Sequence, residues 1–155
     1  MKSNLFSIVL MLPCLLAAVP ARAASDLRLA PNLSFTDDSS ANFPIAGDSI
    51  GDANLASDHA TIIFFGTAHC WNTNREAERL VALYPKYRDR IDFVIVDLDH
   101  PSLAQRMLIA NYYRRAIPTV TVIDRKGKVL YDRAGETAST RGDTSNLESL
   151  LNSAK

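Results

Sequence analysis

Apolar residues in the second part of the chain form alternating strand-like and helix-like patterns. Continuous apolar runs, typical of buried strands, predict strands at residues 60–65, 91–98 and 119–124, with a fourth at residues 129–133. Apolar residues at helical spacing predict helices at residues 70–84, 103–113 and 146–153. Strands that are separated by helices are expected to pair in parallel, and the last two strands to form an antiparallel hairpin. The pattern therefore predicts an α/β fold with a mixed four-stranded sheet and helices on both faces.

Local signals set the expected ends of the helices. Pro85 is expected to end or kink the first helix, because proline lacks an N–H group and clashes with the preceding turn. Ser145 and Glu148 have the spacing of a capping box at the start of the last helix. These signals predict compact helices separated by short turns.

Residues 1–23 have the pattern of a signal peptide. Lys2 gives a positive start, residues 5–19 are almost wholly apolar, and Ala21 and Ala23 supply the small residues that a signal peptidase recognises. The apolar run is shorter than the roughly 20 residues that span a bilayer. We therefore expect a cleaved signal and an exported protein, in a bacterial periplasm or secreted, with no stable membrane insertion; an uncleaved anchor is the alternative.

The rest of the chain divides into a lead-in, residues 24–56, and a regular domain, residues 57–155. The lead-in is rich in Ser, Asp, Asn, Gly and Pro, so it is expected to be irregular. Its few apolar residues suggest a short strand near residues 33–35 and a helical turn near residues 50–56.

Charge excludes some classes of partner. The whole chain carries 17 basic and 17 acidic residues, and loss of Lys2 and Arg22 with the signal leaves 15 basic residues and a net charge near −2. No basic stripe indicates nucleic acid, and no acidic tail indicates a cationic partner. The composition leaves the oligomeric state open.

Cys70 is the residue on which the chemistry depends. Signal cleavage would remove Cys14, so the mature protein would hold a single cysteine in an oxidising compartment where cysteines normally pair. Such a thiol is either reactive or buried and inert. Cys70 follows a strand and a turn and begins a helix, and free N–H groups and the helix dipole at that place favour a thiolate.

The order of elements and four short motifs resemble the thioredoxin superfamily, from about His59 to the C-terminus. The motifs are residues 64–70, 96–99, 116–119 and 126–128. The resemblance implies that Pro118 follows a cis peptide bond and lies against Cys70. It also implies that the backbone of Ile117, Pro118 and Thr119 binds a peptide or thiol substrate.

The departures from the family pattern restrict the expected chemistry to one thiol. The second cysteine of the family's Cys-x-x-Cys motif is Thr73 here, its buried acid is Phe64, and the tryptophan before the cysteine is His69. Cys70 could then attack a disulfide and hold a mixed disulfide that an outside thiol must resolve. The Thr73 hydroxyl and a protonated His69 would stabilise the thiolate, and Trp71 would cover it as a rim contact.

The resemblance leaves two functions open. One is monothiol exchange or client capture, with protein or small-molecule thiols and disulfides as partners, no resident cofactor, and glutathione as the candidate co-substrate. The other is a redox-inactive binding module of the same fold, in which Cys70 is inert. An iron–sulfur cluster that is bridged between two such chains with glutathione is a minor alternative. No metal site is expected, because no spacing among His59, His69, Cys70, Asp97, Asp99 and His100 matches a known one.

Overall fold

The computed structural model describes residues 27–47, 58–137 and 139–153. The expected signal peptide and the helical turn expected near residues 50–56 lie outside these ranges. The main sheet has four strands in the order β4-β3-β5-β6. These strands are β3 (Ala60–Gly66), β4 (Ile91–Asp97), β5 (Thr119–Ile123) and β6 (Val129–Ala134).

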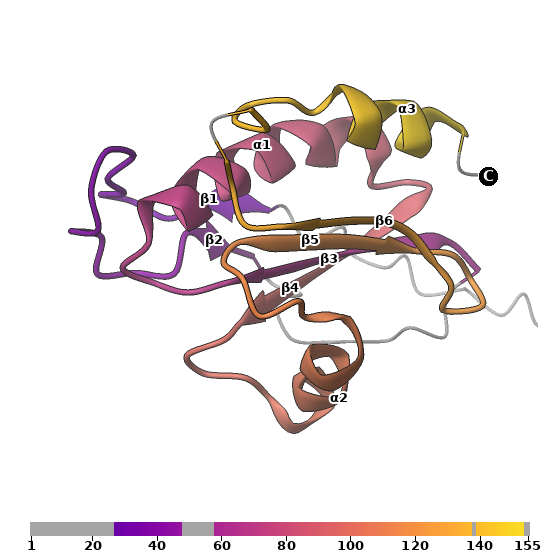
Figure 1. Cartoon of the computed structure of the whole chain (residues 1–155), viewed down its shortest axis with the longest axis horizontal. Coiled ribbons are helices and arrows are strands. Elements are labelled where there is room, and N and C mark those ends of the chain that lie inside the picture. The colour runs from indigo at the N-terminus through magenta and orange to yellow at the C-terminus, as the bar shows by residue number, and fades with distance from the viewer. Residues whose placement is uncertain (1–26, 48–57, 138, 154–155) are drawn as a thin grey trace, which may run out of the picture.

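Helices lie on both faces of this sheet, as the sequence predicts. They are α1 (Trp71–Tyr87), α2 (Leu103–Tyr112) and α3 (Ser145–Ser153). Figure 1 shows α1 and α3 on one face and α2 on the other. None of the helices in the described ranges is long and apolar enough to cross a bilayer.

The direction of β5 corrects the expected pairing. β3 and β4 are parallel, as predicted, but β5 runs antiparallel to β3 although α2 precedes it. Phe65, near the end of β3, pairs with Thr119, the first residue of β5. β5 therefore begins next to the end of β3, and this brings Pro118 and the segment before Cys70 to the same end of the sheet.

Alternation along the buried strands builds a core on each face. In β3, Ile62 and Phe64 pack under α1 and α3, whereas Ile63 and Phe65 pack under α2, and all four are fully buried. Complete burial of such side chains stabilises the fold by about 1.5–3 kcal/mol each. Phe64 thus fills core volume at the position where the family pattern has an acid.

Two predicted helix boundaries are wrong. Pro85 does not end α1, which continues to Tyr87, whereas the alternative of a kink at Pro85 stays a prediction. Tyr87 is fully buried and its hydroxyl donates to Asn152 Oδ1 over 2.9 Å, so packing against α3 holds the last turn despite the proline.

The capping box expected at Ser145 is also absent. Ser145 is already helical, and its N–H donates to Asp143 Oδ1 over 2.9 Å. Glu148 accepts from the Thr144 hydroxyl instead, over 3.1 Å. The helix starts one residue earlier than expected because the residues before it satisfy its first donors.

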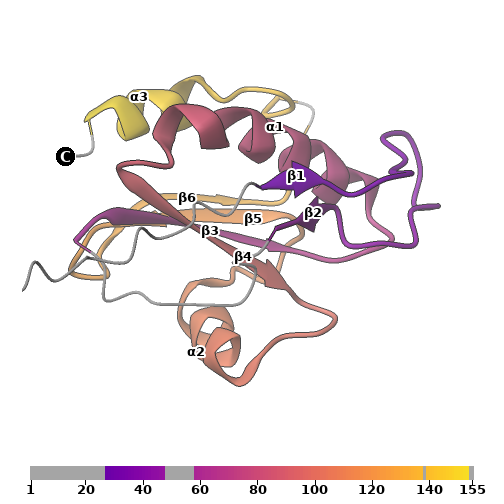
Figure 2. The same cartoon turned by 180° about the vertical axis from the view of Figure 1, so that it is seen from behind.

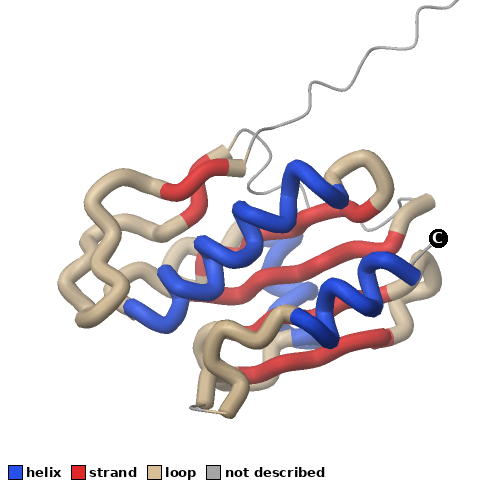
Figure 3. Tube along the Cα trace, turned by 90° about the horizontal axis from the view of Figure 1, so that it is seen from above, coloured by secondary structure: helices blue, strands red, loops and turns tan. Residues whose placement is uncertain are grey.

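The lead-in packs against the main body. β1 (Arg28–Leu29) and β2 (Ile45–Ala46) form an antiparallel ribbon, visible beside α1 in Figure 2. Figure 3 shows α1 flanked by α3 on one side and by the lead-in on the other. The strand expected near residues 33–35 is wrong, because Asn32 has a φ of 59° and the Ser34 N–H donates to the Ser40 hydroxyl rather than to a strand.

Candidate functional site

Cys70 lies between the end of β3 and the start of α1. Its backbone is extended, with φ −139° and ψ 105°, and it occupies the N-cap position of α1. The thiol is free, and the residue is partly exposed. The predicted placement at a helix start is confirmed.

Of the first three N–H groups of α1, one makes a hydrogen bond and two make none to the described residues. The Trp71 N–H donates to Asp38 Oδ1 over 3.0 Å. Among the described residues, the N–H groups of Asn72 and Thr73 have no hydrogen-bond partner. An N-cap side chain normally accepts from these second and third helical N–H groups, but the Cys70 side chain makes no such hydrogen bond in this structure.

Thr73 is oriented for packing. It is fully buried, and a Cβ added to Gly66 would lie 2.4 Å from its Cγ2, so the Thr73 methyl group covers the end of β3. Its hydroxyl has no hydrogen-bond partner among the described residues, the sulfur of Cys70 included. The bond predicted from Thr73 to the cysteine is therefore not formed here.

Long-range hydrogen bonds fix the loop before Cys70. The Ala68 N–H donates to Asp99 Oδ2 over 3.0 Å, and the His69 N–H donates to the Ser40 carbonyl over 3.2 Å. His69 has a φ of 49°, and its side chain is exposed with no partner among the described residues. Asn74, fully buried, donates to the Ser40 hydroxyl over 2.8 Å. The lead-in thus forms one side of the site.

The Pro118 loop lies at the same edge of the sheet. The Ile117–Pro118 peptide bond is cis, as the resemblance implied. The Pro118 carbonyl accepts from the Gly135 N–H over 2.7 Å, whereas neither backbone group of Ile117 is paired within the described ranges. Thr119 is buried and its hydroxyl donates to the Ala116 carbonyl over 2.6 Å. Ile117 is therefore the residue of this loop that could pair with a ligand backbone.

Two arginines lie close to the Trp71 ring. The guanidinium carbon of Arg75 is 4.5 Å from the ring centroid, and that of Arg141 is 5.5 Å away. Both distances are within the range of a cation–π interaction. Trp71 is partly buried, so the predicted rim position next to Cys70 has two positive neighbours. Arg75 lies four residues later on the same helix, whereas Arg141 comes from a distant segment that the sequence did not indicate.

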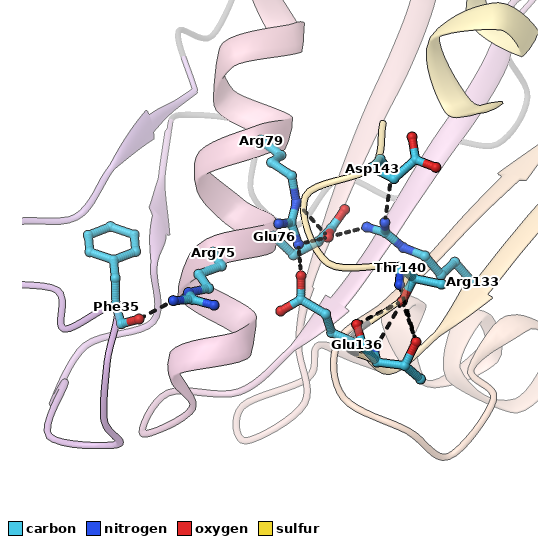
Figure 4. A network of polar contacts seen from close by, with 9 residues as sticks. Phe35, Arg75, Glu76, Arg79, Arg133, Glu136, Thr140 and Asp143 are labelled. Atoms are coloured by element: carbon cyan, nitrogen blue, oxygen red, sulfur yellow. Dashed lines mark hydrogen bonds and ion pairs between the residues drawn. The ribbon is translucent and has the colours of Figure 1, made fainter. Parts of the chain in front are cut away.

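A buried ion network lies further along α1 (Figure 4). Glu76 pairs with Arg79 and with Arg133 of β6, and Arg79 also pairs with Glu136 over 2.6 Å. Burial, the largest single influence, lowers the pKa of Arg79, but the charges and hydrogen bonds of Glu76 and Glu136 together raise that pKa above its ordinary value. Arg133 also donates to the Asp143 carbonyl over 3.2 Å. The network ties α1 to β6 and to the loop that carries Arg141.

The scattered histidines and acids do not converge. His59 is 4.0 Å from Asp92 at the start of β4, and His100 is 3.3 Å from Asp97 at its end. Within the described ranges, no group of three His, Cys, Asp or Glu side chains could hold a metal ion.

The β4-β3-β5-β6 sheet, the cysteine at the start of α1 and the cis proline before β5 together make up a thioredoxin-like fold. No protein-family model and no curated protein matches the chain.

Solved structures that resemble the chain are thioredoxins and a redox protein. Thioredoxin O2 from Arabidopsis thaliana has 20% identity over 63% of this chain and 80% of that chain, with a TM-score of 0.47. Deadhead from Drosophila melanogaster, a germline-specific thioredoxin, has 20% identity over 63% of this chain and 82% of that chain, with a TM-score of 0.48. A redox protein from Chlamydomonas reinhardtii has 21% identity over 61% of this chain and 28% of that chain, with a TM-score of 0.48. These low identities carry no activity over to this chain.

Sequence reasoning missed the residues that reach the site from a distance. Asp38 and Ser40 contact residues more than 30 positions later, and Arg141 approaches Trp71 from the loop before α3. No local spacing links them to Cys70. The one available signal was an acidic and hydroxyl-rich stretch in the lead-in, of the kind that caps helices.

Proposed function

We propose that the chain takes part in thiol–disulfide chemistry through Cys70, as a monothiol that captures a client in a mixed disulfide. The observation that carries the proposal is the N-cap position of Cys70, with the N–H groups of Asn72 and Thr73 unpaired among the described residues. Two N–H donors at the positive end of a helix stabilise a thiolate at that place.

The proposed reaction needs a disulfide and one further thiol. The Cys70 thiolate attacks one sulfur of a client disulfide, that S–S bond breaks, and the other client sulfur leaves as a thiolate that takes a proton from solvent. An outside thiol, as its thiolate, then attacks the client sulfur of the mixed disulfide. Cys70 leaves as a thiolate, and the new disulfide joins the outside thiol to the client. Glutathione is our candidate for the outside thiol. Ile117 would pair with the backbone of the bound client.

The second candidate function is a redox-inactive binding module. The Asp38 carboxylate at the Trp71 N–H favours it, because a negative charge next to the helix start opposes a thiolate on Cys70. The Thr73 hydroxyl, which makes no bond to the cysteine, adds no stabilisation of the thiolate.

One measurement separates the two functions. The full chain is reacted with iodoacetamide, and alkylation of the peptide that contains Cys70 is followed by mass spectrometry in the folded protein and in urea. Monothiol chemistry predicts faster alkylation in the folded protein, because only the folded chain places Cys70 at the positive end of a helix. Alkylation that is equally fast or slower in the folded protein would overturn the monothiol proposal and leave the binding module.

Capture itself is tested by trapping. The reduced chain is mixed with a peptide disulfide and the mixed disulfide is sought on a non-reducing gel, with Cys70→Ser as the control. We further propose that residues 1–23 direct export to a periplasm or to the outside, where client disulfides are common.

A further inference from the structure

We propose that Trp71, Arg75 and Arg141 form a recognition surface for an acidic peptide segment, which would hold the residues that flank a client's cysteine. We call these three residues the Trp71 platform. The inference rests on the proposed capture function for its purpose, but binding to the platform requires no reaction at Cys70.

Arg75 is held in place by the lead-in. Its Nε–H donates to the Phe35 carbonyl over 3.0 Å (Figure 4), while its guanidinium carbon lies 4.5 Å from the Trp71 ring centroid. The described residues offer no ion-pair partner to this guanidinium. Its terminal nitrogens are therefore donors for an incoming carboxylate.

Arg141 is held by a different segment. The loop around it is fixed by the Asp143 N–H, which donates to the Thr140 carbonyl over 3.2 Å, and by the bond from Arg133 to the Asp143 carbonyl. Arg141 is exposed and has no hydrogen-bond or ion-pair partner within the described ranges. The loop before α3 thus brings a second arginine to a tryptophan that already has Arg75 one turn away on α1.

Charge complementarity selects the partner. Asp38, the carboxylate that contacts Trp71 among the described residues, accepts from the Trp71 N–H over 3.0 Å and pairs with neither arginine. A planar guanidinium with unused N–H groups binds a carboxylate in two-point geometry, which a cationic or apolar segment cannot supply.

Trp71 is the single tryptophan of the chain, so its fluorescence reports on the platform directly. The full chain is titrated with a short cysteine-free peptide rich in glutamate, and with glutamine-rich and lysine-rich peptides of equal length. We expect a saturable change with the glutamate peptide that weakens as salt is added. Equal binding of the glutamine or lysine peptide would overturn the proposal. Equal binding of glutathione would overturn its assignment to a peptide segment.

Variants then locate the binding. Arg141→Gln should weaken binding of the glutamate peptide by up to about five-fold, the upper end of the range expected for one exposed ion pair. Arg106→Gln, a matched change at an exposed arginine of α2 on the other face of the sheet, should leave it unchanged. Equal weakening by both variants would overturn the proposal. Because the probe peptide has no sulfur and Cys70→Ser should bind it normally, loss of the platform is distinguishable from loss of thiol chemistry.

Discussion

Glu76 should be the most costly charged side chain to neutralise in this protein. It lies inside α1 with its side chain 1% exposed, and it pairs with Arg79, 15% exposed, and Arg133, 13% exposed. Glu76→Gln keeps the shape of the side chain but leaves two nearly buried guanidinium groups around a neutral amide. Removing one partner of a buried pair costs about 3–5 kcal/mol.

The expected value lies at the lower end of that range. Arg79 keeps Glu136, 2.6 Å away, and Arg133 keeps the Asp143 carbonyl, so neither arginine loses every partner. A loss of ~3 kcal/mol is a large share of the roughly 5–15 kcal/mol by which a domain is stable. With a urea slope of about 1–3 kcal/mol per molar, the unfolding midpoint should fall by at least ~1 M.

Urea unfolding followed by circular dichroism measures this shift. Glu78→Gln is the matched control, since Glu78 is exposed on the same helix and its neutralisation should change stability by less than about 0.5 kcal/mol. If Glu76→Gln does not fold, adding Arg133→Met should recover stability, because the uncompensated charge is then removed. Equal midpoints for Glu76→Gln and Glu78→Gln would refute the reasoning.

Three further predictions concern the surroundings of the site. Gly66→Ala should destabilise the fold by about 1–3 kcal/mol in urea unfolding, because the added Cβ would lie 2.4 Å from Thr73 Cγ2. Adding Thr73→Ser, which removes that methyl group, should recover part of the loss, and no recovery would contradict the packing role of Thr73. Hydrogen bonds from Ser145 lower the pKa of Asp143 below 3.8, so the stability that the ionised carboxylate contributes is lost as the pH falls below that value. Asp143→Asn should therefore lose less stability than the parent chain when urea unfolding is measured at acidic instead of neutral pH, and an equal loss in both chains would contradict this. Asp38→Asn should speed alkylation of Cys70 several-fold by removing a negative charge while keeping an acceptor for the Trp71 N–H, and slower alkylation would show that the carboxylate assists the thiol.

The strands and helices were predictable because their signals are local, but the direction of β5 was not. Buried strands such as β3 are continuous apolar runs, and α2 begins at a true capping box, in which Ser102 and Gln105 bond reciprocally. Where packing outweighs a local signal, prediction failed. Pro85 reads as a helix end, yet the burial of Tyr87 extends α1 beyond it.

The site was predictable only in part, for the same reason. Cys70 and Pro118 carry signals in their own segments, and the structure brings both to one edge of the sheet. Asp38, which accepts from the first helical N–H group, and Arg141, the second arginine at the Trp71 ring, come from distant segments, and nothing in their spacing indicates these contacts. Thr73 shows the converse. The hydroxyl of Thr73 suggested a hydrogen bond to the Cys70 sulfur, but in the structure the methyl group of Thr73 packs over Gly66.

The pairing of Asp38 with Trp71 has a consequence for the order in which the molecule assembles. The two residues are 33 positions apart, and the Asn74 contact with Ser34 spans 40, so the helix start is completed only after a long loop has closed. Contacts of high sequence separation form late in folding. The amide proton of Trp71 should therefore gain protection from solvent exchange after those in the middle of α1, whose hydrogen bonds are local.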